Sequence, residues 1–357
     1  MRVLFASTQG AGHFGPLVPF LEACVRGGHE VLVVGPPTLD PGGYPFRPGA
    51  TPPDEELGPV WAGMPAQPPG QGDVVVVGHI FARLNVRAML PTLRAAIDEW
   101  RPDLVLREPN EYASAIAAEE AGVPHARVAI GLALVDEGAL AIATLPLEDE
   151  RPGITVAIAR SPYLTCWPES LDRASFPVAR FSDTTARSAG SLPDWWPRDT
   201  RPLVYVSFGS VAAAVPPAAV AYGKALEAAA RLPCRVLLTT GGELELADVP
   251  PNVHVERWVP QATVLQHAAA VVCHGGSGTT LGSLEAGVPL VVVPLFADQP
   301  HNAVRVAAVG AGIVSSLDGI GRGVEHVLED AAFRDAAEGV AAEMRGLAPV
   351  DGFLDVL

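Results

Sequence analysis

Short apolar runs of strand length alternate along this chain with segments whose apolar residues recur at helical spacing. The runs at residues 3–6 and 31–34 enclose such a segment at 17–26, which a glycine pair terminates. A strand, a helix and a second strand in this order predict a β-α-β unit, in which parallel strands are joined by a right-handed crossover. The same reasoning predicts helices at 86–100 and 112–121 and strands at 102–106 and 126–130.

The pattern starts again in the second half of the chain. An apolar run at residues 203–210 ends in a glycine turn and is followed by a helical segment. Further strands are predicted, with helical segments among them, at residues 236–239, 253–256 and 271–273. Two such α/β domains facing each other would leave a cleft at the carboxyl ends of their strands, where ligands bind in this class of fold.

Two stretches interrupt the regular pattern. Residues 36–72 are rich in proline and glycine and predict a long loop, and residues 145–201 look irregular. Within the second stretch, residues 191–197 (SLPDWWP) predict an interdomain linker. We therefore expect an N-terminal domain at 1–190, a linker at 191–201 and a C-terminal domain at 202–357.

The composition narrows the class of protein. A chain of 357 residues, 49% of them apolar, can bury two sizeable cores. The formal charge of −16 argues against nucleic acid as a partner. We expect no membrane span and no signal peptide, and hence a cytoplasmic protein with free thiols at its four scattered cysteines, Cys24, Cys166, Cys234 and Cys273.

The most informative motif is a glycine-rich turn after an apolar run. Residues 268–273 predict a buried strand, and residues 274–280 (HGGSGTT) lead from it into a helical pattern. In such a turn the bare backbone N–H groups and the helix dipole favour an anion, which predicts a phosphate site. The acid–amide pair Asp298-Gln299 follows the next apolar run and suits the recognition of sugar hydroxyls.

Four motifs in this order resemble those of the UDP-glycosyltransferase-like superfamily of GT-B fold enzymes, and most of all its bacterial natural-product glycosyltransferases. They lie at residues 12–16 (GHFGP), 206–210 (VSFGS), 258–261 (WVPQ) and 274–299. The resemblance covers most of the chain and implies an α/β architecture of two facing Rossmann-like domains. It further implies inverting transfer of a hexose from a nucleotide diphosphate to an acceptor hydroxyl.

His13 is the candidate catalytic base, on the turn after the first strand. An acceptor hydroxyl is a poor nucleophile until a base takes its proton, and an imidazole suits that task at neutral pH. A carboxylate commonly fixes the tautomer of such a histidine. The family places an Asp after a strand of the N-terminal domain, and the matching residue here is Glu108, with Glu111 as the competing candidate.

The resemblance assigns the donor site to the second half of the chain. Trp258, with the backbone of Val259, would bind the base, Ser210 and the glycine-rich turn the diphosphate, and Asp298-Gln299 the sugar. The full set of expected donor-binding residues is Ser210, Trp258, Val259, Gln261, His274, Gly276, Ser277, Gly278, Thr279, Asp298 and Gln299.

One departure from the family concerns the nucleotide. Many plant and animal relatives carry a Glu eight residues after the motif histidine, where it binds both ribose hydroxyls of UDP. Here that position is Gly282, and Glu285 stands three residues further on. The missing carboxylate weakens the case for UDP and favours a dTDP-sugar, so that the expected donor is a dTDP- or UDP-sugar. With no Asp-x-Asp motif in the chain, we expect no metal and no other cofactor.

The acceptor side is less patterned. Apolar residues within or close to 36–85 and 131–190 favour a hydrophobic small-molecule acceptor; they are Trp61, Phe81, Met89, Leu132 and Leu134. The alternatives are lipid-linked N-acetylglucosaminyl transfer, sugar-nucleotide epimerisation and a non-catalytic GT-B partner protein. A dinucleotide-binding dehydrogenase is disfavoured, since no acidic residue ends the second predicted strand, where residues 34–36 (VGP) stand instead. We expect a monomer or a homodimer.

Overall fold

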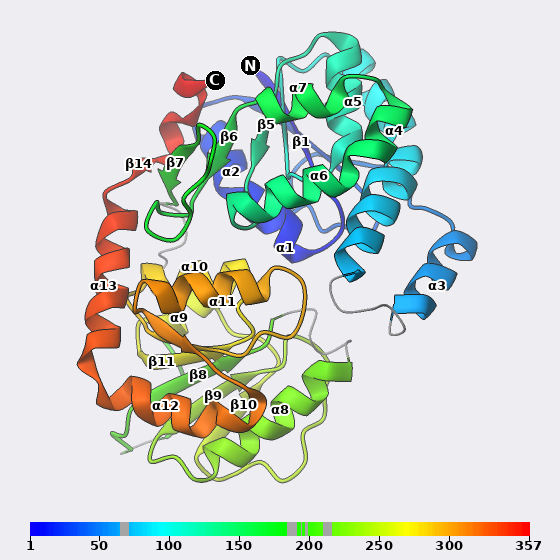
Figure 1. Ribbon diagram of the computed structural model, residues 1–357. Helices are drawn as coiled ribbons and strands as arrows, with labels where there is room; N and C mark the ends of the chain where they lie inside the picture. The colour runs from blue at the N-terminus through cyan, green and yellow to red at the C-terminus, as the bar shows by residue number, and fades with distance from the viewer. Residues whose placement is uncertain (65–70, 184–190, 194, 197–198, 210–215) are drawn as a thin grey trace. The chain divides into compact units, whose positions relative to one another are not determined.

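The computed structural model of the chain describes residues 1–357 except 65–70, 184–190, 194, 197–198 and 210–215. Its internal contacts divide the chain into two α/β units, which Figure 1 shows with their labelled elements. The first unit comprises Met1–Cys166, Ala174–Asp183 and Ala348–Leu357, and the second comprises Trp167–Arg173 and Thr184–Leu347. The expected α/β class with two parallel-sheet domains is confirmed.

The first unit is built on an eight-stranded sheet in the order β14-β7-β6-β5-β4-β1-β2-β3, and every pair in it is parallel. Its strands are β1 (Arg2–Ala6), β2 (Glu30–Gly35), β3 (Phe46–Pro48), β4 (Leu104–Arg107), β5 (His125–Val128), β6 (Tyr163–Thr165), β7 (Ala179–Ser182) and β14 (Ala348–Pro349). Because β1 lies between β2 and β4, the loops that follow β1 and β4 meet at one edge of the sheet.

Helices cover both faces of this sheet. They are α1 (Ala11–Phe14), the 3-10 helix η1 (Gly15–Leu17), α2 (Val18–Arg26), α3 (Asp54–Gly63), the π-helix η3 (Val74–Asn85), α4 (Val86–Trp100), α5 (Tyr112–Ala121), α6 (Ala133–Glu150), α7 (Ile154–Arg160) and the 3-10 helix η6 (Val350–Val356). Leu4 and Val105 pack with η3 and α4–α7 in one core, while Phe5 and Leu106 pack with α2 and η6 in the other. This alternation along β1 and β4 is that of strands buried on both faces.

The two stretches expected to be irregular contain regular elements, which corrects the sequence analysis. Residues 36–72 include β3 and α3, and residues 145–201 include the end of α6 as well as α7, β6 and β7. Helix α3 begins after Pro53 with three acidic residues in its first turn, which the helix dipole favours. All ten residues of α3 are described and none is buried, so no apolar stripe marks this helix in the sequence.

The last ten residues belong to the first unit. Strand β14 pairs in parallel with β7, and the ring of Phe353 in η6 packs edge to face on Phe20 of α2, with ring centroids 5.2 Å apart. Arg26 of α2 bonds Asp351 at 2.8 Å. These contacts place residues 348–357 with the N-terminal sheet, whereas we expected them in the C-terminal domain.

The second unit holds a six-stranded parallel sheet in the order β10-β9-β8-β11-β12-β13. Its strands are β8 (Leu203–Ser207), β9 (Arg235–Thr239), β10 (Val253–Glu256), β11 (Ala268–Cys273), β12 (Leu290–Val292) and β13 (Gly312–Val314). Its helices are α8 (Pro216–Ala229), α9 (Gln261–Leu265), α10 (Ser277–Glu285), α11 (Gln299–Ala308), the 3-10 helix η5 (Leu317–Gly319), α12 (Ile320–Glu329) and α13 (Ala331–Arg345). Helices α8 and α12 pack on one face of the sheet, and α9, α10 and α11 lie on the other (Figure 1).

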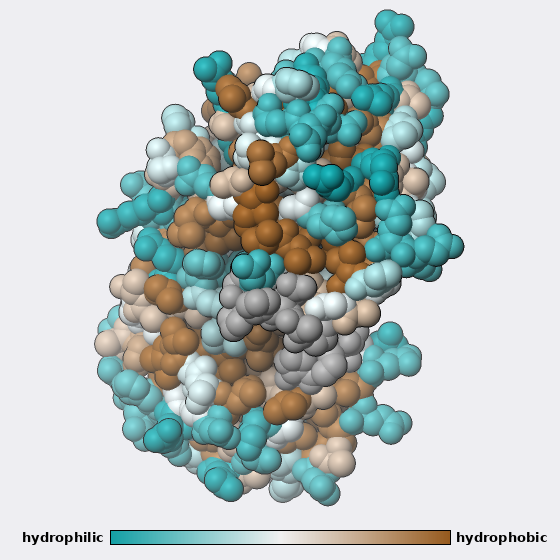
Figure 2. All heavy atoms as spheres, turned by 45° about the vertical axis from the view of Figure 1, so that its right-hand side comes forward, coloured by the Kyte–Doolittle hydropathy of each residue, from teal (hydrophilic) through white to brown (hydrophobic). Residues whose placement is uncertain are grey.

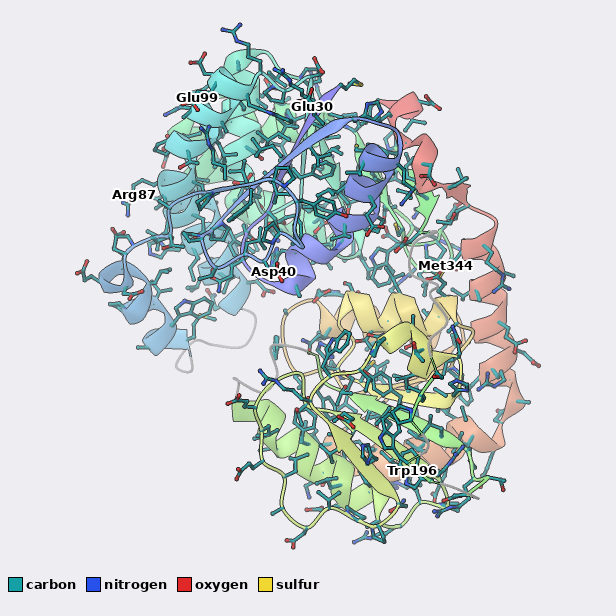
Figure 3. The ribbon with its side chains drawn as sticks, turned by 180° about the vertical axis from the view of Figure 1, so that it is seen from behind. Glu30, Asp40, Arg87, Glu99, Trp196 and Met344 are labelled. Carbon is teal, nitrogen blue, oxygen red and sulfur yellow. The ribbon has the colours of Figure 1, made fainter. Side chains whose placement is uncertain are left out.

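Part of the expected linker is described and packs on the edge of this second sheet. Trp195 stacks on His254 of β10 with ring centroids 4.5 Å apart, and the Arg235 guanidinium of β9 lies 5.9 Å from the ring of Trp196 (Figure 3). The segment Trp167–Arg173 joins the same unit because Arg305 of α11 donates to the Leu171 carbonyl at 2.5 Å.

One helical stretch among the described residues is long and apolar enough to cross a membrane by length and composition alone: Val74–Trp100, formed by η3 and α4. Its buried residues pack in the core of the first unit with α5 and α6. Its exposed residues include Arg83, Arg87, Arg94, Asp98 and Glu99. Arg87, labelled in Figure 3, forms an ion pair with Glu56 of α3. A single helix of this kind is weak evidence for a membrane span.

Candidate active site

The loops after β1 and β4 bring His13 and Glu108 together. His13 lies in α1, which the left-handed residue Gly10 (φ 112) introduces, and Glu108 directly follows β4. Nδ1 of His13 is 3.2 Å from Oε1 of Glu108; the imidazole is 23% exposed, while the carboxylate is fully buried. Because β1 and β4 are neighbours in a parallel sheet, two residues 95 positions apart in the chain form a pair at its carboxyl edge.

The buried carboxylate of Glu108 accepts hydrogen bonds from both flanking loops. The hydroxyl of Thr8 donates to Oε1 at 2.7 Å and its backbone N–H at 3.3 Å, and the N–H of Asn110 donates to Oε2 at 2.7 Å. Burial by itself would raise the pKa of Glu108, but His13, Thr8 and Asn110 together bring it below its usual value. The carboxylate is therefore ionised at neutral pH and can stabilise a protonated imidazole.

Glu111, the other candidate partner of His13, has a different role. It is the N-cap residue of α5, where its carboxylate accepts the Ser114 N–H at 2.9 Å. Burial raises its pKa, and the bonds from Ser114 oppose that rise only in part. The structure thus pairs Glu108 with His13 and uses Glu111 to begin a helix.

Phe81 is a further neighbour of His13. It belongs to the π-helix η3, and its ring meets the imidazole edge to face, with centroids 5.5 Å apart and planes at 73°. A π-helix of twelve residues is unusual, and such segments are frequent at functional sites. We had named Phe81 only as an apolar acceptor contact, since helical spacing gives no sign of a π-helix.

In the second unit, the imidazole of His274 fits between two glycines. A Cβ on Gly209 would come within 2.9 Å of the ring, and a Cβ on Gly276 within 2.5 Å. Burial lowers the pKa of His274 to about 4, although a bond with the backbone of Ser207 acts in the opposite direction. The ring is therefore neutral at pH 7, and its single N–H is engaged by the bond with the Ser207 backbone.

Helix α10 starts directly after this turn, with Gly276 at its N-cap. Ser277, Gly278 and Thr279 form its first turn, whose N–H groups have no acceptor inside a helix. Together with the helix dipole, these donors make the turn suitable for an anion, as the sequence predicted for the phosphate site.

The predicted sugar-binding pair lies at the start of α11, beside the glycine turn. Oδ2 of Asp298 accepts the Ser277 hydroxyl at 3.2 Å and the Asn302 amide at 2.8 Å, and the same amide reaches the Gly275 carbonyl at 2.9 Å. Asn302 thereby ties the two loops together. Its spacing of four residues from Asp298 on a helix is the signal that could have revealed it.

The side chain of Gln299 bonds the backbone, whereas we expected it to bind a sugar. It is 3% exposed, and its Oε1 accepts the backbone N–H groups of Leu295 and Phe296 at 2.8 and 2.9 Å. The carbonyl oxygen of this amide is thus committed to the turn before α11. Any hydrogen bond to a sugar would fall to its amide nitrogen.

The predicted base-binding segment leads from β10 into α9. Trp258 is 71% exposed, whereas Val259 is buried. The side chain of Gln261, at the start of α9, approaches Gly282 of α10, so this segment is anchored beside the helix of the glycine turn. Ser210, the remaining predicted donor residue, lies outside the described residues.

The residues that we expected to line an acceptor site differ in exposure. Met89 and Leu132 are buried in the fold and are not available at the surface, which corrects the expectation for these two. Trp61 and Leu134 are 51% and 44% exposed. Both side chains therefore reach the surface. Figure 2 shows in brown the hydrophobic residues exposed on one face of the molecule.

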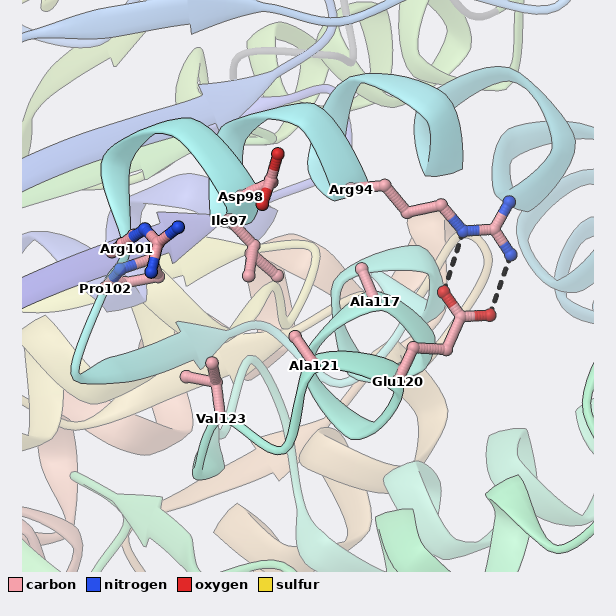
Figure 4. Close-up of a pocket in the computed structure, with 9 residues that line it drawn as sticks. All are labelled: Arg94, Ile97, Asp98, Arg101, Pro102, Ala117, Glu120, Ala121 and Val123. Atoms are coloured by element: carbon pink, nitrogen blue, oxygen red, sulfur yellow. Dashed lines mark hydrogen bonds and ion pairs between the residues drawn. The ribbon is translucent and has the colours of Figure 1, made fainter.

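A metal site and a surface groove are the two other kinds of site to consider in the described parts of the chain. No group of three His, Cys, Asp or Glu side chains there is placed to hold a metal ion. A surface groove lies between the ends of α4 and α5, where Arg94 makes a bidentate ion pair with Glu120 at 2.7 Å beside Ile97 and Val123 (Figure 4). None of the predicted site residues lines this groove.

Comparisons with known proteins show which family models and relatives the chain matches. The chain matches the models of both domains of the erythromycin biosynthesis protein CIII-like family, the N-terminal domain over residues 75–152 and the C-terminal domain over residues 224–349. It is 33% identical to the L-demethylnoviosyl transferase of Streptomyces niveus, over 98% of this chain and 100% of that protein.

Solved structures are similar over the whole chain. The glycosyltransferase SnogD from Streptomyces nogalater has a TM-score of 0.83 and 27% identity, covering 100% of this chain and 98% of SnogD. The spinosyn rhamnosyltransferase SpnG complexed with thymidine diphosphate has a TM-score of 0.79 at 23% identity, covering 100% of this chain and 99% of SpnG, and this likeness supports the fold.

Proposed function

Since the chain belongs to the erythromycin biosynthesis protein CIII-like family of bacterial natural-product glycosyltransferases with the GT-B fold, we propose that it is an inverting, metal-independent hexosyltransferase. Its donor would be a nucleoside-diphosphate sugar, and its acceptor a hydroxyl of a hydrophobic small molecule. The family itself confirms the resemblance drawn from the sequence, and sugar transfer to a small-molecule acceptor follows from it.

The observation that carries the mechanism is the pair of His13 and Glu108. With Nδ1 directed at a buried, ionised carboxylate, the base function falls to Nε2. Nε2 takes the proton of the acceptor hydroxyl as its oxygen bonds to the anomeric carbon and the bond from that carbon to the diphosphate breaks. One displacement from the opposite face inverts the anomeric centre. Glu108 stabilises the imidazolium that forms.

The leaving group gains negative charge, which the second unit can accommodate without a metal ion. The first-turn N–H groups of α10 are donors at a helix N-terminus. Fixed donors aimed at developing charge lower the barrier without reorganisation. Asp298 keeps Oδ1 for a sugar hydroxyl, since its two bonds with Ser277 and Asn302 both involve Oδ2.

Two features favour a thymidine-type donor. Position 282 is glycine, so no carboxylate is available there for a ribose 2′-hydroxyl, and the Gln261 amide fills the space above it. In addition, SpnG is described in complex with thymidine diphosphate. The acceptor would be apolar, because Phe81 borders His13 and exposed apolar residues occur on the same unit.

The alternatives fit less well. Relatives that match nearly the whole chain are named L-demethylnoviosyl transferase and elloramycin glycosyltransferase, which disfavours an epimerase or a lipid-linked N-acetylglucosaminyltransferase. A non-catalytic partner protein would have no use for a buried carboxylate held against His13 by Thr8 and Asn110.

The test is a screen of dTDP-glucose and UDP-glucose against a panel of hydrophobic hydroxylated aglycones, read by mass spectrometry with and without EDTA. We expect a glycosylated product that EDTA does not diminish. His13→Ala should lower kcat by about 10²–10⁴-fold, while calorimetry with dTDP should give an unchanged affinity. Full transfer by His13→Ala, or transfer abolished by EDTA, would overturn the mechanism.

A further inference from the structure

Arg107, the residue before Glu108, is a buried charge that the proposed mechanism does not use. It is the last residue of β4 and has 0% exposure. Burial lowers the pKa of this guanidinium to about 10, with a smaller effect of Arg127 in the same direction and opposing effects of Glu111, Tyr112 and Glu108. It is therefore still charged at neutral pH, and a buried charge of this kind must have hydrogen-bond partners.

The partners of Arg107 are the carbonyls of the loop that carries Glu108. Nη1 donates to the backbone oxygens of Glu108, Pro109 and Glu111 at 3.2, 3.1 and 3.3 Å. Among the described residues, Nε and Nη2 meet no hydrogen-bond partner. The bonding of this guanidinium is thus directed at one turn of four residues.

One peptide group joins Arg107 to the carboxylate of Glu108. The carbonyl of Pro109 bonds the guanidinium, and the N–H of the same peptide, which belongs to Asn110, bonds Oε2 of Glu108 at 2.7 Å. A trans peptide is planar, with its C=O and N–H pointing in opposite directions. Fixing the carbonyl on one side therefore fixes the direction of the N–H that holds the carboxylate on the other.

We propose that Arg107 is a positioning residue that orients the loop 108–111, so that the Glu108 carboxylate is held against Nδ1 of His13. The consequence for catalysis rests on the proposed function, but the placement of the carboxylate does not. The two can therefore be tested separately.

The placement is tested by following the titration of the His13 imidazole by NMR in the full-length chain labelled with ¹⁵N-histidine, with His13→Gln to assign the signal. A nearby carboxylate favours the protonated imidazole. Glu108→Gln should accordingly lower the titration midpoint by about one pH unit or more. Arg107→Met should lower it as well.

The sign of this shift separates positioning from simple electrostatics. Removing a positive charge near His13 would by itself raise the midpoint, since like charges disfavour protonation. A fall in Arg107→Met therefore means that the carboxylate has moved away. Arg127→Met is the matched control: Arg127 is a buried arginine paired with Arg107 in the β4–β5 register, and it bonds the Ala159 and Ser161 carbonyls instead. It should leave the midpoint unchanged or raise it slightly.

The double variant Arg107→Met/Glu108→Gln shows whether Arg107 affects the titration of His13 through Glu108 or through Glu111. If Arg107 acts through Glu108, the double variant should titrate as Glu108→Gln does, whereas an effect through Glu111 would lower the midpoint further. Arg107→Gln keeps two N–H donors without the charge, so the titration midpoint should fall less than in Arg107→Met. This variant replaces Arg107→Met in the experiment if the methionine variant does not fold. An unchanged or raised midpoint in a folded Arg107 variant would overturn the proposal.

Kinetics then connect the placement with transfer. With an acceptor from the screen, Arg107→Met should lower kcat with little change in the KM for the sugar nucleotide. A normal kcat in His13→Ala would refute the proposed function and leave the titration result standing. A normal kcat together with an unshifted midpoint in Arg107→Met would refute the positioning role alone.

Discussion

Nε2 of Gln261 lies 3.1 Å from the position that a Cβ on Gly282 would occupy. The amide from the start of α9 thus fills the space where many plant and animal relatives carry a ribose-binding glutamate on α10. The absence of a side chain at Gly282 and the presence of Gln261 above it are two parts of one arrangement. A larger residue at position 282 would have to displace this amide.

This arrangement predicts how nucleotide preference can be changed. Gly282→Glu combined with Gln261→Ala should bind UDP about tenfold better, relative to dUDP, than the native chain does, because a carboxylate bonded to a hydroxyl contributes about 1.5 kcal/mol. UDP and dUDP differ only in the 2′-hydroxyl, so the ratio of their Kd values by calorimetry isolates that contact. Gln261→Ala alone should leave the ratio as it is. A native chain that already prefers UDP over dUDP tenfold would contradict the assignment.

The fit of His274 between two glycines gives a second prediction. Gly276 has φ −63 and ψ 143, which any residue can adopt, so Gly276→Ala tests only the space that the ring occupies. Overpacking of this kind costs about 1–3 kcal/mol. We expect a lower unfolding temperature and at least about tenfold weaker binding of dTDP.

A matched glycine controls for the added methyl group. Gly339 lies exposed in α13, and a Cβ there would meet no described atom within 4 Å. Gly339→Ala should raise the stability by about 0.5–1 kcal/mol, because alanine loses less entropy in a helix. If Gly276→Ala melts and binds dTDP like the native chain, the ring of His274 does not lie where the structure has it.

Acid stability depends on a histidine that is buried in its neutral form. Burial, with Arg107, Arg127 and Arg151, lowers the pKa of His125 from 6.5 to about 3. Glu119, at 3.3 Å from Nε2, favours the charged form but is outweighed. Below pH 6.5 the unfolded chain binds a proton at His125, whereas the folded chain does not. The free energy of unfolding therefore decreases as the pH falls from about 6.5 towards 3.

The measurement is the unfolding temperature of the native chain and of His125→Gln at pH 6.5, 5.5 and 4.5, values chosen to span roughly this window. On acidification the unfolding temperature of the variant should fall less than that of the native chain. Protonation of His274 lowers the unfolding temperature of both proteins. Parallel curves for the two proteins would show that His125 is not the group responsible.

Elements buried on both faces could be predicted from the sequence. Strands β1 and β4 are continuous apolar runs because both of their faces are covered, and α4 shows a clear apolar stripe despite Pro91 in its interior. Helix α6 was missed. Pro146 lies inside it, and proline normally ends a helix, so the pattern looked irregular from there on.

The site was predictable to the extent that it depends on sheet topology. His13 and Glu108 follow neighbouring parallel strands, and a strand order with β1 beside β4 brings such residues together. The hydrogen bonds that hold Glu108 could not be predicted from the sequence. Thr8 and Asn110 donate partly through backbone N–H groups, whose directions depend on the loop conformation and not on the residue type. The exposed Trp258 and the buried Gln299 likewise follow from tertiary packing.

The return of residues 348–357 to the first sheet has a consequence for synthesis and engineering. A ribosome completes the second unit before it delivers β14 and η6, so the N-terminal sheet lacks its edge strand and Phe20 lacks its aromatic neighbour Phe353 during that interval. At about 5–20 residues per second the interval is on the order of ten to thirty seconds. A chimera that takes its second unit from a relative should therefore keep these ten native residues, because they complete the unit that it retains.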